Sequence, residues 1–291
     1  MGEIICKLSY ILHAQIFYAG GRTYLSQASL LVTPTARYLG NILRHTKPSM
    51  RHFTTSNFSN MPYSYGQLLS VIVISMVSGS VSFIASFTLI VMILMSADKL
   101  KTPLRRLIVG VSVSDVIASF SNVLNPIMIP SGVLAYGNQG PCEAVAFSNH
   151  FGAFASMLYT LSLCIYYVHV IKYNTSDRDF ATRIEPWLHG ISIGYPLLGS
   201  IVNLAVGNFN SMGLICWIYS QPLYCADDPD VECIRGANAE AYKLIFAMMP
   251  LFVSFIGSVY VMVVISLTVI KQERRNARFR FQDQQTSDGI N

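Results

Sequence analysis

The sequence predicts an all-α membrane protein, built as a bundle of about five transmembrane helices. Hydrophobic residues make up 52% of the 291 positions and charged residues only 12%, whereas soluble domains carry roughly 25% charged residues. The apolar residues stand in long blocks, and the bases of this chain, whose net charge is +5, lie beside those blocks. This pattern excludes a water-soluble globular domain and provides no extended basic face for nucleic acid.

Five blocks are long enough to be spans, because a helix of about 20 apolar residues crosses the hydrocarbon core of a bilayer. The first block contains no charged residue, and the second contains one acid, Asp115. The other three contain no Asp, Glu, Lys or Arg. The predicted spans are residues 68–95, 107–130, 144–171, 187–207 and 244–270, within a helical bundle of residues 65–271.

Basic residues predict the orientation, because cytoplasmic loops retain Lys and Arg. The connections after spans one and three and the tail 272–291 are basic, whereas the connection between spans two and three has no base. We therefore expect a multi-pass plasma-membrane protein with its N-terminus outside and its C-terminus in the cytoplasm. The bases concerned are Lys99, Lys101, Arg105, Arg106, Lys172, Arg178, Arg183, Lys271, Arg274, Arg275, Arg278 and Arg280.

Residues 1–64 form an N-terminal extension that we expect to be disordered or cleaved. Glu3 is its single acid, and its apolar run is broken by polar residues, so it resembles a signal or transit peptide only weakly. Asn57 begins the sequence Asn-Phe-Ser, a glycosylation site on the predicted outer side.

Asp115 is the acid within span two, where an unpaired carboxylate is costly and usually functional. Ser112, Ser119 and Asn122 share its helical face, so the four residues form an inward polar stripe. The stripe could hold a cation or a proton. Alternatively, Asp115 is neutral and only hydrogen-bonds to a neighbouring helix.

Pro126, Pro196 and Pro250 lie within spans two, four and five. Each removes an intrahelical hydrogen bond and is expected to kink its helix, which would open space for a ligand. The ordinary alternative is that proline is simply common in membrane helices.

No segment indicates an enzyme, so we expect no catalytic residue, metal site or cofactor. The sequence has no phosphate-binding glycine loop, nucleophile elbow or zinc-protease motif. His150, His169 and His189 lack metal-ligand partners at helical spacing, and we expect them to be hydrogen-bonded or interfacial.

Four cysteines lie on the predicted outer side. Cys142 begins span three and Cys216 lies in the long connection before span five, within reach of a bridge. Cys225 and Cys233 could close a small second loop. Reduced cysteines or other pairings remain alternatives.

Several segments resemble rhodopsin-like and cyclic-AMP-receptor-like G-protein-coupled receptors, closest to divergent sequences of microbial eukaryotes. They are residues 101–107 leading into Val113-Ser114-Asp115, Cys142, residues 163–167 and Cys216-Trp217. The resemblance implies a partial seven-helix receptor fold that stops before its last two spans, a cation-binding role for Asp115, and a disulfide from Cys142 to Cys216. It departs from the family at Tyr166-Tyr167-Val168, which carries no charge where an acid-arginine pair is usual.

The resulting hypothesis is a receptor-like protein that contacts membrane lipid, an extracellular small-molecule or peptide ligand and a heterotrimeric G protein. It would signal inward by repacking its helices around a ligand held among spans two, three and five. Two alternatives are a small transporter with Asp115 as a proton relay and a non-signalling membrane subunit.

Overall fold

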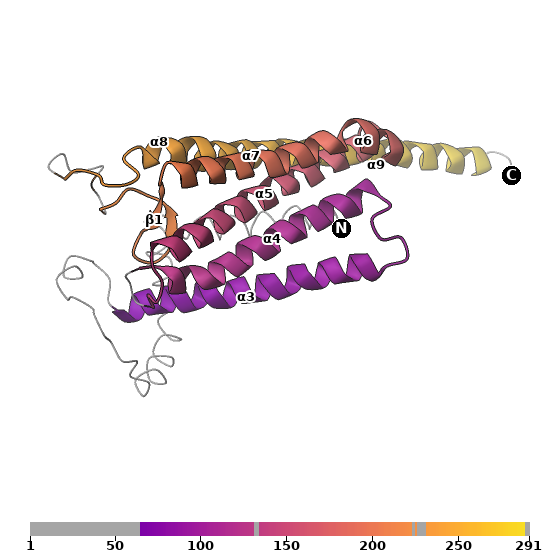
Figure 1. The fold of residues 1–291 in the computed structure, drawn as a ribbon. Helices are drawn as coiled ribbons and strands as arrows, with labels where there is room; N and C mark the ends of the chain where they lie inside the picture. The colour runs from indigo at the N-terminus through magenta and orange to yellow at the C-terminus, as the bar shows by residue number, and fades with distance from the viewer. Residues whose placement is uncertain (1–64, 131–133, 223–224, 226–230, 289–291) are drawn as a thin grey trace.

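The computed structural model describes residues 65–130, 134–222, 225 and 231–288, with side chains described only to residue 275 in the last segment. The N-terminal extension, including Asn57, lies outside the described residues. The chain is an elongated helical bundle with one small hairpin at one end (Figure 1). Its elements are α3 (Tyr65–Met95), α4 (Pro103–Met128), α5 (Gln139–Ile171), α6 (Asp177–Arg183), α7 (Glu185–Ala205), β1 (Phe209–Ser211), β2 (Cys216–Ile218), α8 (Ala239–Lys243), the π-helix η2 (Leu244–Met248) and α9 (Met249–Asp288).

The prediction of a five-span all-α bundle is confirmed: the described residues contain five helices long and apolar enough to cross a membrane. Most helix ends differ from the predicted span ends by up to five residues, and the end of the fifth helix differs by more. The third begins at Gln139 rather than residue 144, since the Asn138 side chain caps it by accepting a hydrogen bond from the Gly140 N–H at 3.2 Å. The fifth runs on to Asp288, beyond its apolar part.

Helix α5 is the centre of the bundle. It packs against α4, α7 and α9, whereas α3 packs mainly against α4. In its apolar window 61% of residues are buried, compared with 11% in the fifth span. Gly152 permits the close approach of α4, because a Cβ there would lie 2.6 Å from the backbone nitrogen of Ala118. The contacts of α5 therefore hold α4, α7 and α9 together.

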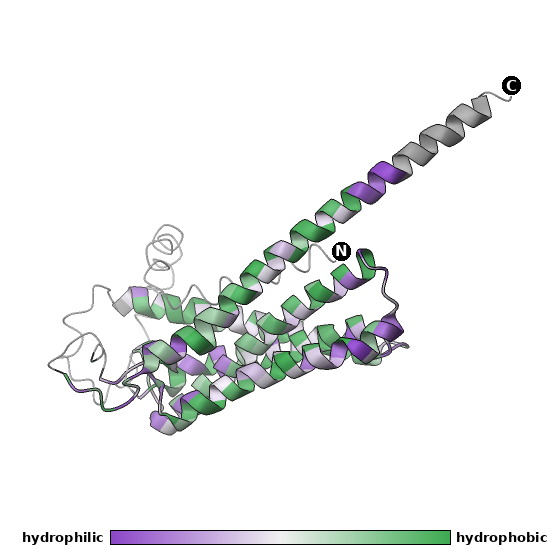
Figure 2. Ribbon diagram, turned by 90° about the horizontal axis from the view of Figure 1, so that it is seen from above, coloured by the Kyte–Doolittle hydropathy of each residue, from purple (hydrophilic) through white to green (hydrophobic). Residues whose placement is uncertain are grey.

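The outward faces of the helices are apolar, as expected for lipid contact. Large exposed hydrophobic residues line α3 and α9, and the hydropathy colouring shows green along both (Figure 2). The C-terminal part of α9 projects beyond the other helices and turns polar from Lys271 to Arg275.

The three prolines that we expected to cause kinks behave differently from one another. Helices α4 and α7 continue without interruption through Pro126 and Pro196. In the fifth span, the irregular turn is the π-helix η2, and Pro250 follows it as the second residue of α9. A π-helical turn of this kind is often found at functional sites.

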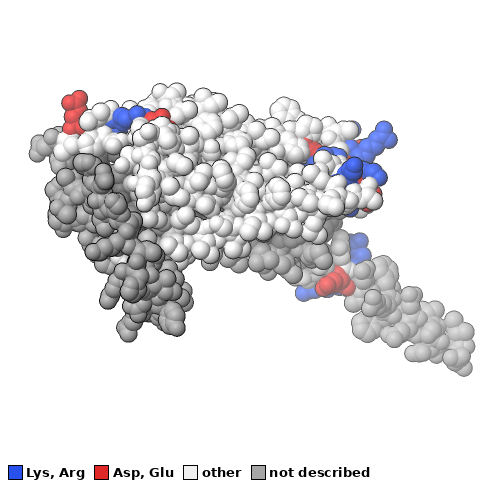
Figure 3. Space-filling model, turned by 60° about the horizontal axis from the view of Figure 1, so that its bottom comes forward, with Lys and Arg blue, Asp and Glu red and all other residues white. Residues whose placement is uncertain are grey.

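The two ends of the bundle differ in composition. At the hairpin end, β1 and β2 pair antiparallel, with Phe209 opposite Ile218 and Ser211 opposite Cys216. At the opposite end, Lys and Arg side chains gather around the start of the projecting part of α9 (Figure 3). We call this second region the basic end; its described bases are Lys99, Lys101, Arg105, Arg106, Lys172, Arg178, Arg183, Lys271, Arg274 and Arg275.

Candidate functional site

Asp115 lies at the interface between α4 and α5, where it accepts a hydrogen bond of 2.5 Å from the Ser156 hydroxyl. Two of the three residues expected to share its face on α4 have other partners. The buried Ser112 donates to the carbonyl of Ile108 in its own helix, and Asn122 accepts from Asn149 of α5 at 2.7 Å. Ser119 is also buried. The polar group beside Asp115 thus comes from α5, which the helical spacing within span two could not reveal.

A second series of polar contacts joins α5 to α7. The Tyr159 hydroxyl lies 2.9 Å from Nδ1 of His189, and the hydroxyls of Ser162 and Ser192 lie 3.2 Å apart. Together with the contacts of Asn149 and Ser156, these make α5 a polar ladder along much of its length. Polar bonds between membrane helices typically contribute about 0.6 to 2 kcal/mol each.

The ladder ends at a buried ion pair at the basic end. Glu185, whose side chain is 6% exposed, binds Arg106 of α4 through two contacts of 2.6 Å. His189 approaches the same carboxylate at 3.3 Å, and Arg106 also donates to the Leu100 carbonyl at 2.8 Å. Sequence reasoning assigned Arg106 to topology and to the segment that resembles the receptors, and missed this pair, since nothing local distinguishes Arg106 from its neighbour Arg105.

Tyr166 occupies the place where the resemblance had implied a charged pair. Its hydroxyl donates to Asp177 of α6 at 2.9 Å, and its ring lies edge-on to Phe180, with centroids 5.0 Å apart. Phe180 is fully buried against α5. This contact holds the short helix α6 in place without an arginine.

His150 requires a correction, because we had expected it to be hydrogen-bonded or interfacial. It is 1% exposed, and neither ring nitrogen has a hydrogen-bond partner among the described residues. Phe154 and Phe209 lie against it, with ring centroids 4.6 and 6.0 Å away. Opposite stands Gly199, where a Cβ would lie 3.3 Å from the His150 Nε2 and 2.9 Å from Phe246 of η2. The π-helical turn, α5 and α7 therefore meet around an unsatisfied polar group.

The hairpin is held to the bundle by side chains near the start of α5 and the end of α4. Asn125 accepts from the backbone N–H of Cys216 at 2.6 Å and donates to its carbonyl at 3.2 Å. Gln139 donates to the Phe209 carbonyl at 3.0 Å, and Glu143 forms an ion pair with Arg235. The sequence had predicted a kink at Pro126, and it did not indicate that the neighbouring Asn125 would bond to the hairpin.

Two disulfides lie at the hairpin end. One joins Cys142 at the start of α5 to Cys216 in β2, and the other joins Cys225 to Cys233. These are the pairings that the sequence and the resemblance had suggested.

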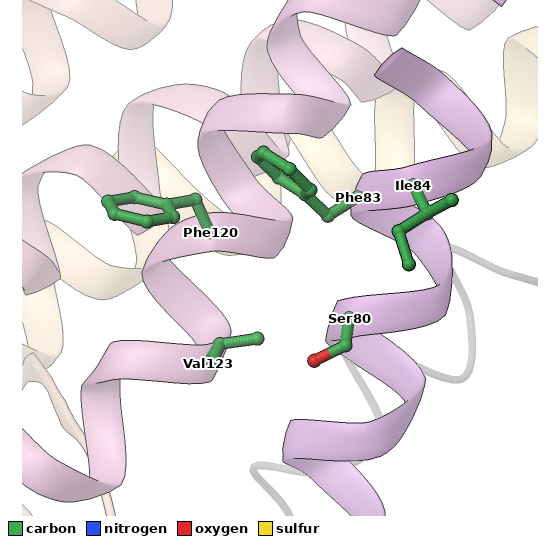
Figure 4. A pocket seen from close by; sticks show the side chains of 5 residues that line it. All are labelled: Ser80, Phe83, Ile84, Phe120 and Val123. Atoms are coloured by element: carbon green, nitrogen blue, oxygen red, sulfur yellow. The ribbon is translucent and has the colours of Figure 1, made fainter. Parts of the chain in front are cut away.

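A shallow apolar groove between α3 and α4 contrasts with these polar contacts. The rings of Phe83 and Phe120, one from each helix, lie with centroids 6.2 Å apart, above Val123 and Ser80 (Figure 4). Its lining includes Ile84 and a single hydroxyl, so it lacks the convergent polar groups that fix a polar ligand.

Comparisons with known proteins agree with this fold. The family model for the slime mold cyclic AMP receptor matches residues 66–282. Squid rhodopsin has the same fold at a TM-score of 0.58 and 12% identity, over 82% of this chain and 63% of that chain. The chain thus spans less than two thirds of the length of that protein, and no curated protein matches it significantly in sequence. Because the family match covers most of its length, the chain is a multi-pass membrane protein that belongs to the slime mold cyclic AMP receptor family.

Proposed function

We propose that the chain senses an extracellular ligand at the hairpin end and transmits its binding through the helices to the basic end, as a G-protein-coupled receptor does. The observation that carries the proposal is the buried, unpartnered His150 beneath the hairpin. A polar group left unsatisfied in a membrane protein costs free energy, so a natural explanation is a partner that arrives with the ligand. The family's description makes cyclic AMP the first ligand to test.

The ligand position that we propose differs from the one suggested by the sequence. Spans two, three and five had been expected to hold it, whereas His150 faces Gly199 of α7 and Phe246 of η2. The fourth span therefore replaces the second as a neighbour of α5 in this site, and the fifth span remains as expected.

Orientation and location follow the same scheme. Disulfides form in oxidising compartments, and the described cystine bridges all lie at the hairpin end. We therefore place the hairpin end and the N-terminus outside the plasma membrane, and the basic end with the C-terminus in the cytoplasm, facing a heterotrimeric G protein.

Asp115 and Ser156 are proposed as a cation site within this pathway. Their contact brings a carboxylate and a hydroxyl together in the middle of the bundle, and both are ligands that suit a small hard cation. A cation there would favour one packing of α4 against α5 and so bias the receptor toward one state.

The test is binding of radiolabelled cyclic AMP to the full chain in lipid nanodiscs. His150→Phe should weaken binding at least tenfold while raising thermal stability, because it removes an unsatisfied polar group. His169→Gln, a histidine at the opposite end of α5, should change neither. Unchanged binding by the His150→Phe variant would exclude this ligand position, and a folded wild-type chain without binding would exclude cyclic AMP as the ligand.

A further inference from the structure

The guanidinium of Arg235 is only partly used by the protein. Its Nη2 binds Oε1 of Glu143, while its Nε is buried and has no partner among the described residues. Guanidinium groups normally bind a carboxylate or phosphate through two adjacent donors. Of the Nε and Nη2 donors that such a pair would use, Arg235 has Nη2 occupied by Glu143 and Nε unoccupied.

The backbone holds Arg235 in a fixed place. Its carbonyl accepts from the Gln221 N–H at 2.9 Å, and its own N–H donates to the Gln221 carbonyl at 3.1 Å. Gly207, with φ of +69°, leaves room beside the guanidinium, since a Cβ there would lie 3.3 Å from Nη2. A side chain presented by a fixed backbone is preorganised to bind.

The present partner of Arg235 is shared and replaceable. Oε1 of Glu143 also accepts from Gln139 at 2.9 Å, and the Glu143 side chain is 23% exposed. The other described base at the hairpin end, Lys243, is engaged by Glu240 and lies over the Tyr219 ring. Arg235 is thus the described base at this end with a buried donor that has no partner among the described residues.

Glu143 and His150 lie seven residues apart on α5, so they share one face and are separated by about 10 Å along the helix. Phe209 connects the two positions: its ring packs against His150, and its carbonyl accepts from Gln139. One ligand could therefore meet an imidazole at one end and a guanidinium at the other.

We propose that Arg235 is the anion-recognition residue of the receptor, and that an oxyanion of the ligand displaces Glu143 to bind Nε and Nη2 together. This inference rests on the proposed function and specifies the ligand class as a phosphate ester. Release of Glu143 also loosens the attachment of the hairpin to α5, which couples binding to movement.

The experiment compares cyclic AMP, adenosine and inorganic phosphate as probes of the full chain in nanodiscs, by direct binding and by ligand-induced thermal shift. Glu143→Gln should tighten cyclic AMP binding about fivefold, because it removes a competing charge worth about 1 kcal/mol. Arg235→Lys keeps the positive charge but loses the two adjacent N–H donors, so it should weaken cyclic AMP binding about tenfold. Lys243→Gln is the matched control and should stay within about twofold.

The gain from Glu143→Gln should disappear in the Arg235→Lys background, and adenosine should not distinguish any of these variants. If neither Glu143→Gln nor Arg235→Lys changes the affinity for cyclic AMP, the role of Arg235 is overturned while the proposed function stays intact. Phosphate stabilisation that depends on Arg235, without cyclic AMP binding, would support the anion site and reject cyclic AMP. No response to either anion in the folded wild-type chain would overturn the inference.

Discussion

At the hairpin end, a disulfide from Cys142 to Cys216 and two hydrogen bonds from Asn125 hold β2 against the helices. At the basic end, the Arg106 to Glu185 ion pair joins α4 to α7, and the Tyr166 to Asp177 hydrogen bond joins α5 to α6. No covalent link is present there among the described residues. The difference suggests that one end is fixed and the other can rearrange, because ionic and hydrogen-bonded contacts exchange partners without bond cleavage. This is the arrangement expected of a protein that receives a signal at one end and repacks at the other.

Removing the Cys142 to Cys216 bridge should have the largest effect on stability. The bridge closes a loop of 74 residues, so replacing both cysteines by Ser should lower the free energy of unfolding by about 4 kcal/mol. The Cys225 to Cys233 bridge spans only 8 residues, and its removal should cost about 2 kcal/mol. Denaturant titration in mixed micelles measures both. Equal losses would show that chain entropy does not govern the hairpin end.

Arg106→Leu tests the basic end and should cost about 3 kcal/mol, because it leaves the Glu185 carboxylate buried without its cation. Arg105→Gln is the control, because Arg105 donates to the Ser96 hydroxyl at 2.9 Å and approaches only an exposed carboxylate, that of Asp98 at 3.6 Å. The change should alter stability by less than about 1 kcal/mol. The double change Arg106→Leu with Glu185→Leu should recover most of the loss. The same micelle titration applies, and similar effects at 105 and 106 would argue against the buried pair.

Asn125→Ala measures how much the hydrogen bonds, as distinct from the disulfide, contribute to holding the hairpin against the helices. The substitution removes two buried bonds to Cys216 and should cost about 2 kcal/mol. Asn122→Ala, which loses one bond to Asn149, should cost about 1 kcal/mol. Amide hydrogen exchange of residues 209–218 should rise in the first variant only; protection retained in both would show that the disulfide suffices.

Adding sodium tests the proposed cation site at the contact between Asp115 and Ser156, which lies between the two ends of the bundle. At ten times its dissociation constant it should stabilise the wild-type chain by about 1.4 kcal/mol if Asp115 and Ser156 bind it. Asp115→Asn should abolish this gain, and potassium chloride at equal ionic strength is the control. Thermal unfolding provides the measurement. A gain that survives in the variant would assign Asp115 to helix packing alone.

The fold was largely predictable from the sequence, whereas the site was not. Long apolar blocks form helices in lipid whatever their neighbours, so the existence and order of the five long apolar helices could be predicted. The partner of Asp115 could not be foreseen, because Ser156 comes from another helix and depends on how the two pack. The burial of Glu185 beside the predicted start of span four likewise follows from the position of Arg106 on α4.

Three elements had no signal in the hydropathy pattern. Strands β1 and β2 have three residues each, too short to show alternation, and they exist because the disulfide and Asn125 hold them in place. Helix α6 has seven residues and depends on the burial of Phe180. The state of His150 was misjudged, since single-sequence reasoning assigns partners by frequency and cannot detect their absence.

Helix α9 is 40 residues long, which corresponds to about 60 Å, or roughly twice the hydrocarbon thickness of a bilayer. Its first turn follows the π-helical segment next to His150 and Gly199, so a change at the proposed ligand position would reach α9 at its start. A tilt of about 10° at Pro250 would carry the far end of such a rod through roughly 10 Å. A small rotation there would thereby become a displacement on the scale of a helix diameter, and it would require α9 to exchange contacts with α5, such as those of Val261 with Cys164.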